Sequence, residues 1–348
     1  MRSFTSIFKK MRTRKLLGVL AVSISFFTCL FLTGQWVACH QPEWVQQDPL
    51  PLSYRNMNSL SQFETRGYSL AWLDTQGQMN VNWALYYDIG SLVDWARKAD
   101  VLFLGNSRPF YAFRDNLIQT MEKGSGLKFY SLAGPGNNFP YSEAIIYRNH
   151  LFPRLIVINE DNFFNPKLIP PQKEAMTGSW WQGWSYTYSN YFKWLINFYL
   201  RKSIPEFVFF KADHGKKRIS LGSPETGFLF FENNSEGHQP LIEGHEKNSL
   251  NPIYLGMARK FIREMEDRGC EVILTFVPYG KNTDFVVEEA DELGVPCILP
   301  KVKGLETFDG FHLTPESSER FGKAFFELFF KLPEVQKLVK ERKKKNFE

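Results

Sequence analysis

Cysteine and histidine are scarce in this sequence, and their scarcity excludes whole classes of protein. Four cysteines in 348 residues rule out a disulfide-stapled scaffold and a multi-zinc protein. The six histidines show no metal-ligand spacing, so neither a metal nor any other cofactor is expected. Aromatic residues are abundant instead. The 33 Phe, 14 Tyr and 9 Trp residues exclude disorder as the dominant state of the chain.

Positive charge is scarce on the main body of the chain. Residues 1–39 hold six basic residues and no acidic ones, and residues 331–348 hold seven basic and three acidic residues. The 291 residues between them, 40–330, hold 29 basic and 34 acidic residues. Nucleic-acid binding requires basic residues concentrated on a folded surface, so we expect no nucleic-acid partner.

A long uncharged run lies close to the N-terminus. Residues 16–34 carry no charge, and the apolar character extends to Ala38. About 20 helical residues at 1.5 Å each match a hydrocarbon core of about 30 Å. The six basic residues precede this run and Trp36 stands at its far end, as the positive-inside rule and interfacial aromatics require. The sequence therefore predicts a cytoplasmic segment 1–15 and a single transmembrane helix 16–38 in the cytoplasmic (inner) membrane. Everything beyond would be periplasmic or extracellular.

Two other interpretations of this segment remain open. The run could be a cleaved signal peptide, although it is long for one and no clean A-x-A site follows it. Cys39 could be lipidated, although Trp36 three residues earlier fits a lipoprotein signal poorly. The length of the run favours an uncleaved anchor.

The exported part divides into three segments. Residues 39–98 are expected to form a juxtamembrane stalk and lead-in that ends in a helix over 88–98. From residue 99 to about 330, short apolar runs alternate with helical stretches, and residues 331–348 form a basic C-terminal tail. The pattern predicts an α/β domain with three α/β/α layers around a parallel, flavodoxin-like five-stranded sheet. The predicted strands are 101–104, 128–132, 155–158, 272–277 and 297–299, and the predicted helices are 141–151, 252–268, 284–293 and one that begins at Pro315.

An insert at about 165–250 interrupts the alternation. It contains eight aromatic residues in a span of fifteen, from Trp180 to Trp194. Rings at this density could stack on sugars or rest on a lipid surface. They could equally pack as a cap subdomain against the main sheet.

Polar or small residues follow the predicted strands. The carboxyl ends of parallel strands are where the active sites of such sheets lie. Ser107 follows the first strand and could act as an exposed nucleophile. Gly136 follows the second strand and could present a backbone N–H, and Asn162 follows the third and could present an amide. Near the C-terminus, Asp309 precedes His312 by three residues, a spacing that lets the carboxylate orient the imidazole.

Four blocks in this order resemble the SGNH (GDSL-like) hydrolase superfamily over about residues 99–330. The blocks read LFLGNSR, SLAGPGNN, NEDN and DGFHLTP. The resemblance implies that Ser107 is the nucleophile, His312 the general base and Asp309 its orienting partner. It also implies an oxyanion hole formed by Gly136 and Asn162.

This sequence departs from the family pattern in two blocks. The usual Gly-Asp-Ser is Gly-Asn-Ser, and the usual Gly-x-Asn-Asp is absent from the third block. Gly134 could therefore replace Gly136, and Asn159 could replace Asn162.

The resemblance, together with the anchor, implies a membrane-tethered enzyme of the cell envelope. Proteins of alginate O-acetylation and teichoic-acid D-alanylation are familiar members of that branch. We expect a serine esterase or O-acyltransferase that transfers an acyl group, such as acetyl, to an envelope polysaccharide or removes one. A multi-pass membrane acyltransferase is an expected partner. The alternative is a non-catalytic protein that keeps the fold and binds glycan through its aromatic insert.

Cys270 and Cys297 stand near the starts of the predicted fourth and fifth strands. In an oxidising compartment they could form a disulfide. They could equally remain two free thiols.

Overall fold

The computed structural model describes residues 85–88, 92–134, 136–185, 220–222, 225–232, 238–241, 251–279 and 283–345. All of them fall within one compact unit, Tyr68–Glu348. The predicted transmembrane helix, residues 16–38, lies outside the described residues. None of the helices in the described ranges has the length and apolar character needed to cross a bilayer.

A parallel five-stranded sheet forms the centre of the domain. Its strands are β1 (Val101–Leu104), β2 (Phe129–Ser131), β3 (Leu155–Asn159), β7 (Glu271–Thr275) and β8 (Cys297–Ile298). They lie in the order β2-β1-β3-β7-β8, and every neighbouring pair is parallel. This is the flavodoxin-like order, so the predicted α/β sheet is confirmed.

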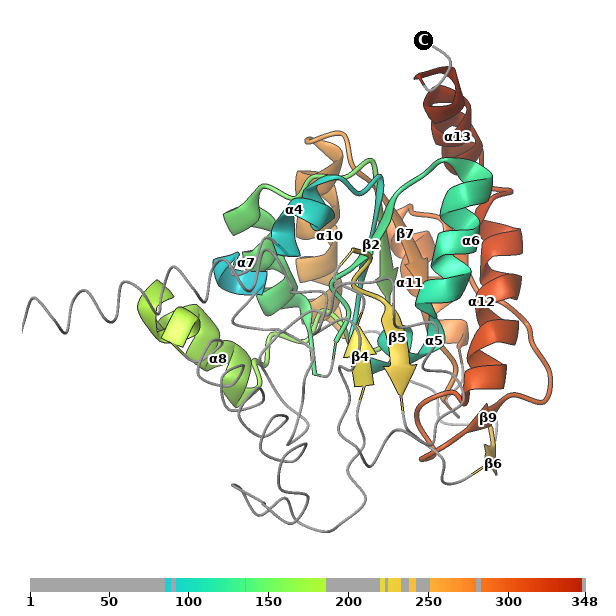
Figure 1. The fold of residues 1–348 in the computed structure, drawn as a ribbon, viewed down its shortest axis with the longest axis horizontal. Helices are drawn as coiled ribbons and strands as arrows, with labels where there is room; N and C mark the ends of the chain where they lie inside the picture. Colours follow the sequence, from blue (N-terminus) through green and yellow to red (C-terminus); the bar gives the residue numbers. More distant parts are fainter. Residues whose placement is uncertain are drawn as a thin grey trace, which may run out of the picture. The chain divides into compact units, whose positions relative to one another are not determined.

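Helices cover both faces of the sheet (Figure 1). On one side lie α5 (Ser107–Ala112), α6 (Asp115–Ser125) and α12 (Pro315–Phe329), and α12 contacts both of the others. On the other side lie α4 (Leu92–Arg97), α7 (Phe139–Asn149) and α10 (Pro252–Glu266), with α11 (Asp284–Leu293) packed beside α10. Right-handed connections between parallel strands produce this distribution.

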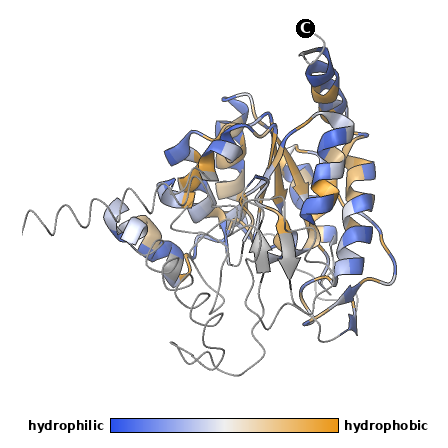
Figure 2. Ribbon diagram, in the orientation of Figure 1, coloured by the Kyte–Doolittle hydropathy of each residue, from blue (hydrophilic) through white to orange (hydrophobic). Residues whose placement is uncertain are grey.

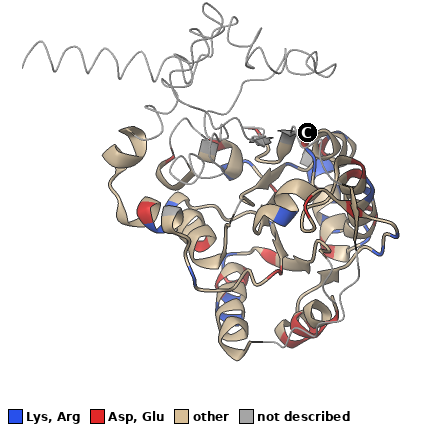
Figure 3. Ribbon diagram, turned by 90° about the horizontal axis from the view of Figure 1, so that it is seen from below, with Lys and Arg blue, Asp and Glu red and all other residues tan. Residues whose placement is uncertain are grey.

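Apolar character concentrates in the strands and on the inward helix faces. Figure 2 shows the central strands as the most hydrophobic segments and the outer helix faces as hydrophilic. Every residue of β1 and β3 is buried, as expected for strands covered on both faces. Acidic and basic residues are both spread over the helices, as Figure 3 shows.

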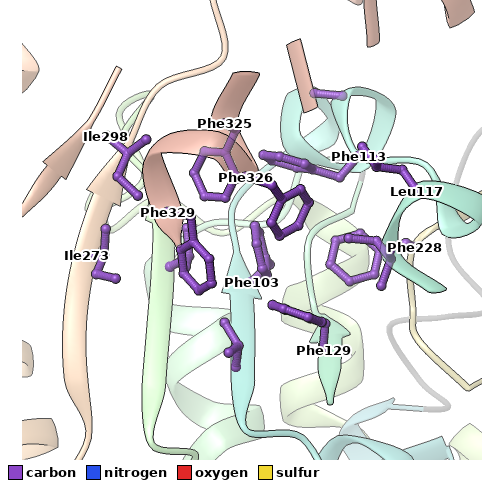
Figure 4. Close-up of a cluster of buried hydrophobic side chains, with 14 of the residues drawn as sticks. Phe103, Phe113, Leu117, Phe129, Phe228, Ile273, Ile298, Phe325, Phe326 and Phe329 are labelled. Carbon is purple, nitrogen blue, oxygen red and sulfur yellow. The ribbon is translucent and has the colours of Figure 1, made fainter. Parts of the chain in front are cut away.

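The core on the α12 side is built from phenylalanines. Phe325, Phe326 and Phe329 point from α12 onto the sheet, where Phe103 and Phe129 receive them (Figure 4). The Phe103 and Phe325 ring centres lie 5.8 Å apart, and those of Phe129 and Phe326 lie 5.6 Å apart. This packing holds the second half of α12 against β1 and β2, and α12 in turn is joined at its first residue to the loop that carries His312.

Part of the predicted insert belongs to this core. Phe228 is fully buried against Phe103, with ring centres 5.2 Å apart. The backbone N–H of Ser131 in β2 donates to the carbonyl of Thr226 at 2.7 Å. The adjoining strands β4 (Ser220–Gly222) and β5 (Leu229–Glu232) pair antiparallel. This stretch of the insert is therefore integral to the domain.

The insert also reaches the loop that carries His312. Strand β6 (Gln239–Pro240) pairs antiparallel with β9 (Glu306–Thr307), which immediately precedes that loop. At the other end of the insert, α8 (Pro170–Thr177) contacts α7. Of the aromatic cluster, the described residues are Trp180, Trp181 and Trp184; the rest lies outside the described ranges.

The predicted basic tail contains a helix, α13 (Pro333–Lys345). Val335 is fully buried and Leu338 nearly so, both within the core cluster. The guanidinium of Arg342 lies 2.9 Å from the carboxylate of Asp100 at the start of β1. Residues 333–345 therefore pack on the domain, which extends beyond the predicted boundary at residue 330.

The two cysteines near the fourth and fifth strands are free thiols. Cys297 pairs in register with Leu274, four residues beyond Cys270 along the neighbouring strand. Four strand residues span about 13 Å, well beyond the 7 Å that a disulfide tolerates between Cα atoms. The disulfide alternative is therefore wrong.

Candidate active site

The turn after β1 brings Ser107 to the surface. Gly105 ends the strand with φ at +149°, and a Cβ there would stand 2.6 Å from Cγ of Pro109 and 3.0 Å from Cβ of Asn159. Only glycine fits this close approach. The chain then turns through Asn106 and enters α5, whose first residue is the partly exposed Ser107.

Ser107 forms a relay with two side chains from the far end of the sequence. Its hydroxyl Oγ lies 2.7 Å from Nε2 of His312. The other ring nitrogen of His312, Nδ1, lies 2.8 Å from Oδ2 of Asp309. Both distances are those of good hydrogen bonds. The order hydroxyl, imidazole, carboxylate is the arrangement by which a serine is activated for nucleophilic attack.

The loop between β9 and α12 holds the imidazole in place. The backbone N–H of Phe308 donates to the carbonyl of His312 at 3.0 Å, and that of Gly310 donates to the Thr307 hydroxyl at 3.2 Å. Thr314 then caps α12, its hydroxyl accepting from the N–H of Ser317. Hydrogen bonds within residues 307–317 therefore hold this loop in one conformation.

Two aromatic rings flank the imidazole of His312. The ring of Phe308 stacks on it at 5.5 Å between centres, and the ring of Tyr111 lies 4.7 Å away. Tyr111 follows Ser107 by one helical turn of α5. The sequence interpretation missed both rings, although each stands within four residues of a predicted site residue.

The carboxylate of Asp309 is held in its charged form. Burial alone would raise its pKa, but hydrogen bonds from the His312 ring and from the backbone N–H groups of Phe311 and His312 outweigh that effect. The pKa of Asp309 lies well below its usual range. A permanent negative charge beside Nδ1 favours the tautomer whose Nε2 accepts a proton from the serine.

Gly136 lies on a loop that is tied to α8. Gln172, fully buried, donates its side-chain N–H to the Gly136 carbonyl at 2.8 Å and to Oδ1 of Asn137 at 3.0 Å. Gly136 is exposed and has φ at +70°, and a Cβ there would meet the side chain of Ile169 at 2.7 Å.

The four residues considered for the oxyanion hole differ in what they can offer. Asn162 is exposed and holds a left-handed conformation, with φ at +53°. Asn159 is buried beneath Gly105, and its Oδ1 accepts from the N–H of Val277 at 2.7 Å. The N–H of Gly134 donates to the Gly105 carbonyl at 3.3 Å. Gly136 and Asn162 thus remain the two accessible candidates, and their role stays a prediction.

A charged cluster beside Ser107 was not predicted. Arg108 forms an ion pair with Asp161, whose side chain is only 2% exposed. Nδ2 of Asn106 donates to the same carboxylate at 2.6 Å, and Oδ1 of Asn106 accepts from the N–H of Arg108 at 2.9 Å. The guanidinium carbon of Arg108 lies 3.3 Å from the centre of the Tyr279 ring. The sequence could have indicated this cluster, because the three partners of Arg108 all follow strands that are neighbours in the sheet.

Within the described residues there is no group of three or more His, Cys, Asp and Glu side chains that could hold a metal ion.

Comparisons with known proteins give little further identification. No protein-family model matches the chain. Subunit 5 of the mouse biogenesis of lysosome-related organelles complex 1 is 31% identical over 93 residues, which is 26% of this chain and 43% of that protein. The chain thus spans less than half the length of this curated relative. A crystal structure from Bacteroides fragilis, described provisionally as an acylhydrolase, aligns with 69% of this chain and 87% of its own at 15% identity and a TM-score of 0.26. That score is too low for the likeness to carry an argument.

Proposed function

We propose that this protein is a serine acyl-ester enzyme that acts through an acyl-enzyme on Ser107. The hydrogen-bonded relay from Ser107 through His312 to Asp309 carries the proposal. The 2.7 Å contact connects Ser107 to His312, 205 positions apart in the chain, and the 2.8 Å contact connects His312 to Asp309. A relay of this kind activates a hydroxyl that is otherwise a weak nucleophile at neutral pH.

In the proposed reaction, Oγ of Ser107 attacks the ester carbonyl carbon while Nε2 of His312 takes the hydroxyl proton. The carbonyl π electrons move to oxygen, which the N–H groups at Gly136 and Asn162 would stabilise. When the tetrahedral intermediate collapses, the ester C–O bond breaks and the alcohol leaves with the proton from His312. Asp309 keeps the imidazole oriented throughout and stabilises its positive charge. Water or a second alcohol then attacks the acyl-enzyme by the reverse sequence.

We further propose that the substrate is an envelope polysaccharide and that the acyl group is acetyl. The predicted anchor over residues 16–38 supports an enzyme held close to the membrane surface, where a membrane-bound acyl donor such as a multi-pass acyltransferase could reach it. The resemblance of the four sequence blocks to the SGNH superfamily supports acyl-ester chemistry. Hydrolysis and transfer share every step up to the acyl-enzyme.

The test is ester turnover by the full-length protein in detergent. We expect hydrolysis of p-nitrophenyl acetate and its loss in Ser107→Ala, because this variant lacks the hydroxyl that lies against Nε2 of His312. Ser179→Ala is the matched control, since Ser179 is exposed and its hydroxyl bonds with Gln182, three residues further along the chain. Equal turnover in Ser107→Ala and the parent would remove Ser107 from the mechanism. Acylation of an added oligosaccharide would distinguish transferase from esterase.

A second candidate, glycan binding without catalysis, is favoured by the exposed tryptophans. Trp180 and Trp181 are 44% and 58% exposed, and the Trp181 and Trp184 rings stack at 5.1 Å. Such rings can stack on sugar faces. Glycan affinity that is lost in Trp181→Ala, with no esterase activity in the parent protein, would support this candidate over the first.

A further inference from the structure

The side chain of Arg108 holds a hydrogen-bond donor that the relay does not use. Arg108 directly follows Ser107, and its side chain is 16% exposed. The Nε–H is buried and has no acceptor among the residues that the structure describes. A buried donor without an acceptor destabilises the fold, so native structures keep few of them. Such a donor beside a nucleophile has a natural acceptor in the substrate.

The guanidinium of Arg108 is fixed before any substrate binds. One of its terminal nitrogens is paired with Asp161, and its central carbon lies over the Tyr279 ring, 3.3 Å from the ring centre. Nδ2 of Asn106 donates at 2.6 Å to Oδ2 of Asp161, the same oxygen that pairs with Arg108. Donors that are already oriented toward developing charge stabilise a transition state most effectively, because they need no reorganisation during the reaction.

The charge on Arg108 persists at neutral pH. Burial lowers its pKa to about 10, and the neighbouring Tyr279 and Asp309 oppose that effect. The influence of Asp309 means that the guanidinium lies within electrostatic reach of the relay.

Some of the backbone and amide donors near Ser107 are not available to the oxyanion, so a further donor could take part. The Gly134 N–H already donates to Gly105. Nδ2 of Asn159 also lacks an acceptor among the described residues, but Asn159 is only 1% exposed, against 16% for the Arg108 side chain. Asn162 stands in the third block, where the sequence departs from the family pattern, and the Asp161 before it is committed to Arg108.

We propose that Arg108 is a catalytic residue whose Nε–H donates to the carbonyl oxygen of the ester at Ser107 and to the oxyanion that replaces it. The inference rests on the proposed function. The donor keeps its proton throughout: the Ser107 proton goes to His312, and Arg108 contributes only a hydrogen bond to the negative oxygen. Asp161, Asn106 and Tyr279 are positioning residues for this donor.

The test compares two variants, because Arg108→Gln alone would leave the buried Asp161 carboxylate unpaired. The double variant Arg108→Gln/Asp161→Asn removes both charges together. Arg108→Lys keeps a charge for Asp161 but lacks the planar Nε–H. In both, we expect kcat for p-nitrophenyl acetate to fall by about 10²–10³ while KM changes little. A phenylboronic acid, which forms a tetrahedral anion on the serine, should bind more weakly by a similar factor.

The outcomes separate this inference from the proposed function. If the parent protein turns over the ester and Ser107→Ala does not, the proposed function stands, whatever the Arg108 variants do. A kcat within about twofold of the parent in both Arg108 variants, or boronate affinity that does not change, would overturn the inference. Loss confined to esters that carry a carboxylate would also overturn it, because Arg108 would then recognise substrate charge. Unfolding midpoints measured alongside exclude misfolding as the cause, and Arg108→Lys decides the matter if the double variant is unstable.

Discussion

Asn106 stands where the resembled family has aspartate. The hydrogen bonds of the Asn106 side chain explain why an amide, and not a carboxylate, fits at this position. Its Nδ2 donates to Asp161 at 2.6 Å, while its Oδ1 accepts from the backbone N–H of Arg108. An aspartate could accept but could not donate, and two carboxylates would face each other at hydrogen-bond distance. Asn106, the residue before the nucleophile, and Asp161, two residues beyond β3, are therefore matched to each other.

At the residue scale we predict that Asn106→Asp destabilises the protein by about 1–3 kcal/mol, the cost of leaving a buried polar group badly paired. Adding Asp161→Asn should restore most of that loss, because an amide then faces the new carboxylate. Denaturant unfolding of both variants, with ester turnover as a second readout, measures the coupling. Equal stability of Asn106→Asp and the parent would mean that the contact contributes nothing.

The elements explain how the relay forms from residues so far apart. Helix α12 begins three residues after His312, and its phenylalanines pack on β1, the strand that leads to Ser107. Ser318 in α12 also donates to the carbonyl of Tyr111 in α5 at 2.8 Å. One helix thus anchors the histidine loop to the helix that carries the nucleophile.

At the element scale, Phe325→Ala should lower the free energy of unfolding by about 3–5 kcal/mol. Phe325 is fully buried, and its ring centre lies 4.9 Å from that of Phe113 and 5.8 Å from that of Phe103. Leu328→Ala on the same helix is the matched control, since Leu328 is 38% exposed. Unfolding by denaturant should separate the two variants clearly. If both cost the same, α12 is not anchored through this cluster.

The elements that could be predicted from the sequence are those with a clear apolar run or a clear helical periodicity. The apolar run Val101–Leu104 and the helix Asp284–Leu293 have the bounds expected from the sequence. The helices α5 and α6 were missed, since Pro109 and the glycine-rich turn beside them suggest a loop. The two-residue strands β6 and β9 consist of Gln-Pro and Glu-Thr, so they form no apolar run to detect.

In the candidate site too, some residues could be predicted from local sequence features, and others depend on contacts that only the folded sheet creates. Ser107 and His312 were predicted because each follows a strand or precedes a capped helix, local features that a sequence displays. The pairing of Arg108 with Asp161 depends on β1 and β3 being neighbours, which only the folded sheet decides. The burial of Phe228 likewise depends on an insert returning to the sheet edge.

At the scale of the whole molecule, two buried glutamates make stability depend on pH. Glu160, directly after β3, and Glu289, in α11, are 3% and 5% exposed and act on each other. Burial raises the pKa of Glu289 to about 7, and burial together with Glu289 raises that of Glu160 well above its usual range. The folded protein therefore keeps protons that the unfolded chain releases above about pH 4.5. Stability consequently falls as the pH rises above about 4.5, and the part that Glu289 contributes is lost once the pH exceeds about 7.

We predict that Glu289→Gln stabilises the protein at pH 8 by about 1–3 kcal/mol relative to its effect at pH 5, because glutamine needs no proton. Glu288→Gln, one residue away and exposed, should show no such difference. Denaturant midpoints at the two pH values measure both. A Glu289→Gln effect that is the same at pH 5 and pH 8 would contradict the assignment.

The most direct test of the central claim is a map of the covalent adduct. Full-length protein is incubated with a fluorophosphonate, and peptide mass spectrometry then locates the modification. One adduct per chain on Ser107, abolished by Ser107→Ala and slowed by at least about tenfold in His312→Ala, is the result we predict. No adduct on the intact protein, or modification spread over other serines at the same rate, would contradict it.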